Sequence, residues 1–68
     1  MEIFEIHTEY IQLNQLLKAS GWCETGAQAN EAIENGAVKV NDKVELRKRN
    51  KLYKDSIIQF NKQKIKIV

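Results

Sequence analysis

The chain has 68 residues, which is enough for one small domain, since domains usually hold roughly 50 to 200 residues. A chain of this length buries only about 60% of its unfolded-state surface, so a deep catalytic cleft would take up much of its core. We therefore do not expect an enzyme. The composition, 43% hydrophobic and 29% charged, is typical of a folded domain and predicts one domain over residues 1–68.

The sequence carries no sign of export or of a bound metal. Its apolar runs are far shorter than the roughly 20 residues that cross a bilayer, and Met1-Glu2-Ile3 has no basic leader. Cys23 has no second cysteine for an internal disulfide, and one Cys with one His is too few for a structural zinc. We expect a monomer in the reducing cytoplasm, with no cofactor, membrane or small-molecule substrate.

Charge is unevenly distributed along the chain. Residues 1–36 hold six acids and one base, a net charge of −5, whereas residues 37–68 hold ten bases and three acids, a net charge of +7. This asymmetry predicts that one face meets a polyanion and the other turns away from it.

The first half of the chain predicts a short strand and two helices. Ile3, Phe4 and Ile6 indicate an edge strand, and a helix is predicted from about Ile11 to Ala19, ending at Ser20-Gly21. Thr25-Gly26-Ala27-Gln28 has the form of a capping box and predicts the start of a second helix, which Gly36 ends. The expected buried stripes are Leu13, Leu16 and Leu17 on the first helix and Ala29, Ala32 and Ile33 on the second.

After Gly36 the apolar period changes from 3.6 to 2, which predicts strands. Val38 and Val40 alternate with Lys39, Asn41-Asp42 is a turn dipeptide, and Val44 and Leu46 resume the alternation. Further short strands are expected at Leu52, Ile58, Phe60, Ile65 and Ile67, with turns at Lys54-Asp55 and Asn61-Lys62. The fold class is therefore α+β, two packed helices followed by a small, mostly antiparallel sheet.

The densest charge cluster is Arg47-Lys48-Arg49, with Lys51 after it and Lys39 and Lys43 before it. An unbroken basic triplet suits an irregular loop that fans its side chains outward, and its Arg forks match phosphate oxygens. Neutralised phosphates release counterions, which gives sequence-independent affinity for nucleic acids. The other reading, equally open from charge alone, is a solvated edge that discourages aggregation between sheets.

Three further features suggest binding or chemistry. The free amides near Thr25 to Gln28 form a potential anion site at a helix start, although most helix starts bind water. Trp22 suits either stacking on a base or, the favoured reading, a plug between the helices. His7 has no nearby nucleophile and Cys23 precedes Glu24, which disfavours a thiolate, so Cys23 reads as a small buried residue.

The stretch from Thr25 to Asp42 resembles the RNA-binding domain named after ribosomal small-subunit protein S-four, also called the alpha-L motif. The matching residues are Thr25-Gly26-Ala27-Gln28-Ala29, Ala32-Ile33, Gly36, Val38, Val40 and Asn41-Asp42, and Leu52, Asp55-Ser56, Ile58 and Phe60 look like the closing strand of that family. Together they span about Leu13 to Phe60. Gly26 and Asp42 depart from the usual Arg and Gly of the family. The short stand-alone bacterial members are resembled by Leu16-Leu17-Lys18, Gly21-Trp22, Gly26-Ala27-Gln28-Ala29 and Glu45-Leu46-Arg47-Lys48-Arg49.

The resemblance implies RNA as the partner, plausibly structured ribosomal RNA or ribosome precursors. The implied mechanism is recognition of shape and backbone, with the second helix start and the basic loop bracketing a phosphate-rich ridge. The candidate RNA-binding residues are Thr25, Gly26, Gln28, Lys39, Asn41, Lys43, Arg47, Lys48, Arg49 and Lys51. The alternative is a basic protein adaptor that docks an acidic partner, which calls for an exposed apolar patch.

Overall fold

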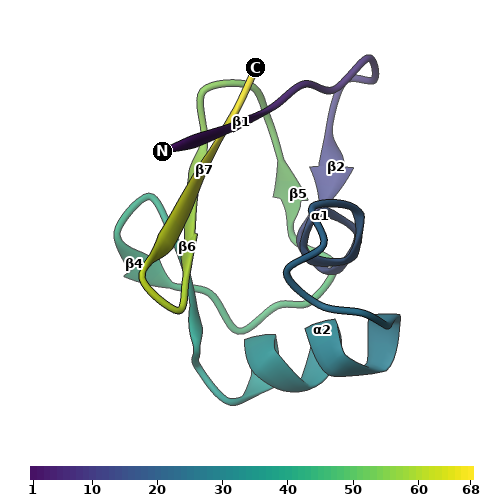
Figure 1. Cartoon of the computed structure of the whole chain (residues 1–68), viewed down its shortest axis with the longest axis vertical. Coiled ribbons are helices and arrows are strands. Elements are labelled where there is room, and N and C mark those ends of the chain that lie inside the picture. Colours follow the sequence, from purple (N-terminus) through teal and green to yellow (C-terminus); the bar gives the residue numbers. More distant parts are fainter.

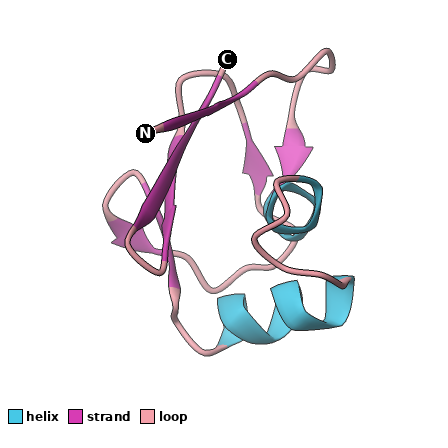
Figure 2. Cartoon of the chain, viewed as in Figure 1, coloured by secondary structure: helices cyan, strands magenta, loops and turns pink.

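The computed structural model describes residues 1–68: two helices pack beside a larger group of strands, and a smaller pair of strands lies next to the first helix (Figures 1 and 2). The elements in chain order are β1 (Glu2–Phe4), β2 (Ile11–Gln12), α1 (Leu13–Ala19), α2 (Gly26–Glu34), β3 (Val38–Val40), β4 (Lys43–Val44), β5 (Lys51–Leu52), β6 (Ile57–Phe60) and β7 (Gln63–Ile67). No helix has the length and apolar character that crossing a membrane requires.

The strands form two sheets. Five of them form a sheet in the order β1-β7-β6-β3-β4, and β2 pairs with β5 in a separate two-stranded sheet. Every pairing is antiparallel except that of β1 with β7. The predicted fold class is confirmed, as is the edge position of the first strand, although that strand ends at Phe4 and leaves Ile6 buried beyond it.

The predicted start of the first helix is wrong by two residues. Ile11 lies in β2, opposite Leu52 of β5, and α1 begins at Leu13. The amide N–H of Leu13 donates to the Asn50 carbonyl and that of the next residue to the Lys48 carbonyl, both at 2.9 Å. The partners that satisfy the start of α1 therefore come from a distant loop, which no local pattern around Ile11 indicates.

The capping box at α2 is confirmed in one half and shifted in the other. Thr25 Oγ1 accepts a 3.1 Å hydrogen bond from the Gln28 amide, as predicted. Gln28 Oε1, however, accepts from the amide of Glu24 at 2.9 Å, one residue before the cap. At the other end α2 stops at Glu34, and Gly36 takes a φ of +77°, which suits glycine.

Two tight turns set the register of the five-stranded sheet. Asn41 and Asp42 have φ values of 51° and 70°, and the β6–β7 turn is alike, with 51° at Asn61 and 66° at Lys62. Left-handed conformations at both central residues match the twist of the flanking strands. The predicted return strand is shorter than expected, because β4 ends at Val44 and Leu46 lies in the loop that follows.

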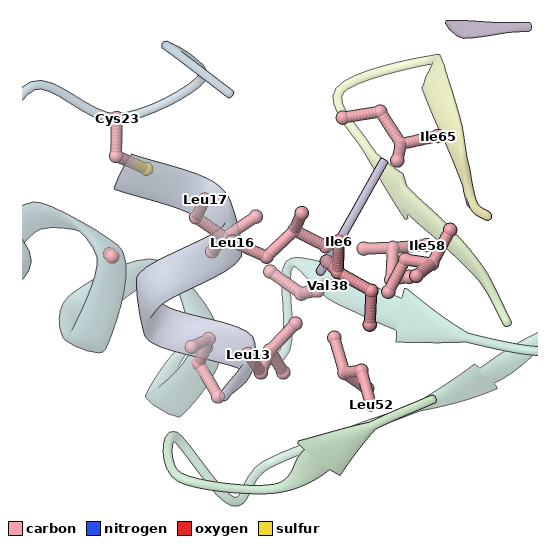
Figure 3. Packing of buried hydrophobic residues seen from close by; sticks show 12 residues of the cluster. Ile6, Leu13, Leu16, Leu17, Cys23, Val38, Leu52, Ile58 and Ile65 are labelled. Atoms are coloured by element: carbon pink, nitrogen blue, oxygen red, sulfur yellow. The ribbon is translucent and has the colours of Figure 1, made fainter. Parts of the chain in front are cut away.

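A single hydrophobic core fills the space between the helices and the five-stranded sheet (Figure 3). The predicted leucine stripe of α1 is fully buried, as are Ala29 and Ile33 of α2, while Ala32 is partly buried against them. The twelve buried residues are Ile6, Leu13, Leu16, Leu17, Cys23, Ala29, Ile33, Val38, Leu52, Ile58, Ile65 and Ile67. These contacts hold α1 in place, and α1 in turn holds the basic segment described next.

Candidate nucleic-acid interface

The basic triplet lies in a loop between β4 and β5, which we call the basic loop (residues 45–50). It is outside any strand, as predicted. Its backbone is fixed, because the carbonyls of Lys48 and Asn50 accept the first two amides of α1 and the Asn50 amide donates to the Arg47 carbonyl at 3.1 Å. The basic side chains therefore project from a backbone anchored to the helix.

Residues 47–50 form a turn, and the side chains from the basic loop into β5 take different directions. Lys48 points to α2, where its Nζ lies 3.5 Å from Glu34 Oε2, and Leu52 is buried. The other residues of this stretch gather around one open hollow of about 450 Å³. This hollow is lined by Arg47, Arg49, Asn50, Lys51 and Tyr53. Three of the predicted RNA-binding residues thus come together, and Lys48 does not join them.

Arg47 is paired with a carboxylate at the edge of the hollow. Its Nε donates to Glu45 Oε1 at 3.0 Å and its Nη2 to Glu45 Oε2 at 3.3 Å. These hydrogen bonds from Arg47 hold the pKa of Glu45 below its usual value, and the same contact raises the pKa of Arg47. A guanidinium has five N–H donors, so Arg47 keeps three for a phosphate. Neither Arg49 nor Lys51 forms an ion pair.

Two tyrosines complete this region, and neither is among the predicted RNA-binding residues. Continuing the β2–β5 register by one residue places Tyr10 opposite Tyr53, and their ring centroids are 6.2 Å apart. Lys51 Nζ lies 4.8 Å from the centroid of the Tyr10 ring, a cation–π distance. The signal in the sequence is proximity alone, since Tyr53 follows Lys51 by two residues. Strand alternation does not predict the shared hollow, because the Asn50 amide donates to the Arg47 carbonyl and closes a turn there.

The start of α2 forms a second, separate group. The side-chain oxygens of Thr25 and Gln28 are engaged in capping, while the amides of Gly26 and Ala27 have no partner in the chain. The basic loop meets α2 at Glu34, in its last turn. At 1.5 Å per residue this contact is about 12 Å along the axis from the helix start. The two predicted anchors therefore do not converge on one phosphate.

The remaining candidates, Lys39, Asn41 and Lys43, lie on the β3–β4 hairpin, across the molecule from β5 (Figure 1). Asn41 Oδ1 accepts the Ile57 amide at 3.0 Å, so this side chain fixes the hairpin to β6. Lys39 pairs with Val44 and Lys43 with Val40, which places the two lysines on opposite faces. The structure does not bring these three residues into one patch with the basic loop.

Trp22 is half-buried and packs against the edge of the core. Its ring centroid is 6.2 Å from that of Phe60, and its Nε1 donates to Glu2 Oε2 at 3.1 Å. The favoured prediction of a packing role is confirmed, but its predicted place between the helices is wrong. The side chain instead packs the α1–α2 connection against the five-stranded sheet. The side chain is partly buried against the core cluster.

The residues examined for catalysis lie apart from one another. Cys23 is a free, buried thiol whose pKa is raised by burial. His7 is exposed beside Glu5, with 3.7 Å between Nε2 and Oε1. Neither residue lines a hollow, and no three His, Cys, Asp or Glu side chains are close enough to hold a metal ion.

Comparison with known proteins agrees with this architecture. The model of the S4 (S-four) domain family matches residues 4–68. The chain is 42% identical over 59 residues, 87% of this chain and 84% of the other, to YbcJ of Escherichia coli (strain K12), which is named as a candidate RNA-binding protein. YbcJ of Shigella flexneri matches equally. The solution structure of E. coli YbcJ, described as revealing an alphaL motif involved in RNA-binding, superposes with a TM-score of 0.77 at 39% identity and covers all of this chain and 87% of the other.

Proposed function

Because the chain belongs to the S4 domain family, we propose that it binds structured RNA through backbone and shape contacts centred on the basic loop. The observation that carries the proposal is the hollow that gathers Arg47, Arg49 and Lys51 on a backbone anchored to α1. Arg offers planar donor pairs and Lys a point charge, which together suit a run of phosphates. The names of the E. coli relative and its solved structure support the same function.

The proposal extends to the class of RNA and the state of the protein. Ribosomal RNA or ribosome precursors suit recognition of folded backbone, because such RNAs present closely spaced phosphates at junctions. A monomer in the cytoplasm is supported by a core that one chain completes and by a free thiol.

The start of α2 and the hairpin contribute outlying contacts in this proposal. The amides of Gly26 and Ala27 donate hydrogen bonds to a phosphate at the positive end of the helix, and the capping bonds of Thr25 and Gln28 hold these amides in place. Lys39, Lys43 and Lys48 supply longer-range attraction, and Asn41 keeps the hairpin in register. The acidic side chains of Glu31 and Glu34 restrict RNA to the first turns of α2.

Crosslinking in cells, followed by sequencing of the attached RNA, tests the proposal. We expect one or a few structured RNAs to be enriched in the wild type and lost in a variant with Arg49→Glu and Lys51→Glu. A matched control with Lys62→Glu and Lys64→Glu changes the net charge equally, in the β6–β7 turn and on β7, and should keep the enrichment. Enrichment that is absent, or equal in both variants, contradicts the proposal.

An adaptor that docks an acidic protein is the second candidate, and one observation favours it. Val44 and Leu46 are 52% and 59% exposed, and both approach Gly36, so they form a small apolar pair beside the basic loop. A protein partner that survives nuclease treatment in a pulldown, and is lost in a Val44→Ser, Leu46→Ser variant, assigns this function instead.

A further inference from the structure

We propose that the hollow beside Tyr53 receives one unpaired nucleotide of the RNA, with its base stacked on the Tyr53 ring and its phosphates on Arg47 and Arg49. This inference rests on the proposed function and adds the class of nucleotide that the site takes. It also assigns the aromatic contact to the tyrosine pair instead of to Trp22, whose ring packs against Phe60 in the core.

The first argument is the combination of groups in the hollow. Nonspecific sites for single-stranded nucleic acid pair a basic groove with aromatic side chains that stack on bases. Here Tyr53 is 48% exposed and lines the same hollow as Arg47, Arg49 and Lys51. The hollow is open to solvent and lined mostly by polar side chains, which suits a nucleotide that stays joined to the rest of the RNA chain.

The second argument is that the ring of Tyr53 is held in position before any ligand arrives. Tyr10 lies next to it at 6.2 Å and an interplanar angle of 58°, and both tyrosines flank the hydrogen-bonded β2–β5 ladder. Lys51 Nζ rests over Tyr10 at 4.8 Å, which keeps its ammonium at the rim of the hollow. A platform fixed in this way loses little conformational entropy on binding.

The third argument concerns pairing. A base within an A-form helix has both faces covered by its neighbours, so it offers no face to a tyrosine. Bulges, loops and junctions expose such faces, and they also bring phosphates close together. The hollow therefore suits a bulged or looped nucleotide in structured RNA.

The test is a binding cycle with three RNA hairpins of the same stem: one with a bulged adenosine, one with an abasic bulge and one fully paired. Compared with wild type, Tyr53→Leu should bind the bulged RNA about tenfold more weakly, because the variant loses the stacking of one base on the ring. Its binding of the fully paired RNA should weaken by less than about twofold. The abasic bulge should weaken wild-type binding by a similar factor and should not weaken Tyr53→Leu further. Tyr53→Phe, which keeps the ring, should match wild type within about twofold.

Each outcome separates the inference from the function beneath it. If wild type binds none of the hairpins at low salt, the proposed function fails. If wild type binds all three but Tyr53→Leu weakens bulged and paired RNA equally, or neither, the nucleotide site is overturned and RNA binding stands. If adenosine monophosphate binds as tightly as the bulged hairpin, the hollow is a site for a free nucleotide, and the inference is again overturned. Melting curves verify that each variant is folded.

Discussion

At the scale of single residues, Glu45 determines how Arg47 enters the site. Its carboxylate accepts hydrogen bonds from both the backbone amide and the guanidinium of Arg47, so it fixes the orientation of the side chain while neutralising part of its charge. The exposed position of the guanidinium makes the pair weak enough for a phosphate to compete.

The depressed pKa of Glu45 gives a prediction about acid. Because the folded-state pKa of Glu45 lies below its unfolded value, the pair stabilises the protein above the unfolded pKa, and this contribution is lost as pH falls through the folded value. In Arg47→Gln the Glu45 pKa should rise toward its usual value, and the stability difference from wild type should vanish in acid. NMR titration of the Glu45 carboxyl carbon measures the pKa, and urea unfolding at several pH values measures the difference in stability. An unchanged Glu45 pKa in the variant contradicts the assigned cause.

Cys23 should be dispensable for binding. Its thiol is only 7% exposed and packs in the core away from the basic loop, so Cys23→Ser should leave RNA affinity within about threefold. Stability should fall by about 1 kcal/mol, because a hydroxyl replaces a thiol in an apolar setting. Fluorescence anisotropy and thermal melting measure the two effects. If alkylation of the thiol abolished binding by protein that circular dichroism shows to be folded, Cys23 would have a role that the structure does not assign.

At the scale of elements, a helix or strand boundary could be predicted from the sequence when the residues that set it are close together in the chain. The cap of α2 was predictable because Thr25 and Gln28 are three residues apart, and the hairpin because Asn41-Asp42 is a local turn signal. The start of α1 was not, because its partners lie in the basic loop. The basic cluster can be seen from the charges in the sequence. The ion pair of Lys48 with Glu34 cannot, because the two residues are far apart in the chain and no local pattern links them.

The C-terminal end of α2 gives a prediction about backbone conformation. Gly36→Ala should destabilise the protein by about 1 kcal/mol, because Gly36 has a φ of +77°. The added Cβ would meet only Val44 Cγ1 at 3.8 Å and Leu46 Cδ2 at 4.0 Å, so the cost comes from the backbone and not from a clash. The melting temperature should fall by roughly 4–8 °C.

Gly26→Ala is the matched control for this substitution. Gly26 is the first residue of α2, has no positive φ and has no atom within 4 Å of an added Cβ. Alanine restricts the unfolded chain and fits a helix, so stability should stay the same or rise by up to about 1 kcal/mol. An equal loss in both variants would show that the conformation of Gly36 is not the cause.

At the scale of the whole molecule, the acidic and basic halves of the chain pair through β1–β7 and β2–β5, and the ion pair of Lys48 with Glu34 also joins them. The acidic residues 1–36 supply both helices, and the basic residues 37–68 supply most of the strands and the basic loop. RNA that approaches the basic half is attracted by many lysines at long range. In the proposed function, the hollow turns this attraction into a defined complex.

Binding should therefore depend strongly on salt. If three to five phosphates are neutralised, the logarithm of the association constant should fall against the logarithm of salt concentration with a slope of about −2 to −4. Dissociation constants in the micromolar range or tighter are expected at low salt. Anisotropy titrations with a structured RNA hairpin at several salt concentrations give the slope, and a flat dependence is incompatible with an electrostatic mechanism.

A comparison of two triple variants asks whether affinity follows position or only net charge. Arg47, Arg49 and Lys51 line the hollow, whereas Lys62, Lys64 and Lys66 lie in the β6–β7 turn and on β7. Changing either set to Glu alters the net charge equally. Each lost phosphate contact costs about 1 kcal/mol or more, so reversing the hollow residues should weaken RNA binding at least about a hundredfold at moderate salt.

The lysines Lys62, Lys64 and Lys66, which we call the β7 set, could themselves belong to a second RNA-binding surface. The sheet register places Lys64 beside Gln59, and Gln59 beside Lys39, so the outer face of the sheet carries its own basic row. If RNA binds at the basic loop, reversing the β7 lysines should weaken binding by only a few fold, through loss of long-range attraction. A larger loss for the β7 set would move the site to the outer face, where Lys39 would be its central residue. Equal losses would mean that affinity follows net charge and that the hollow is not a localised site.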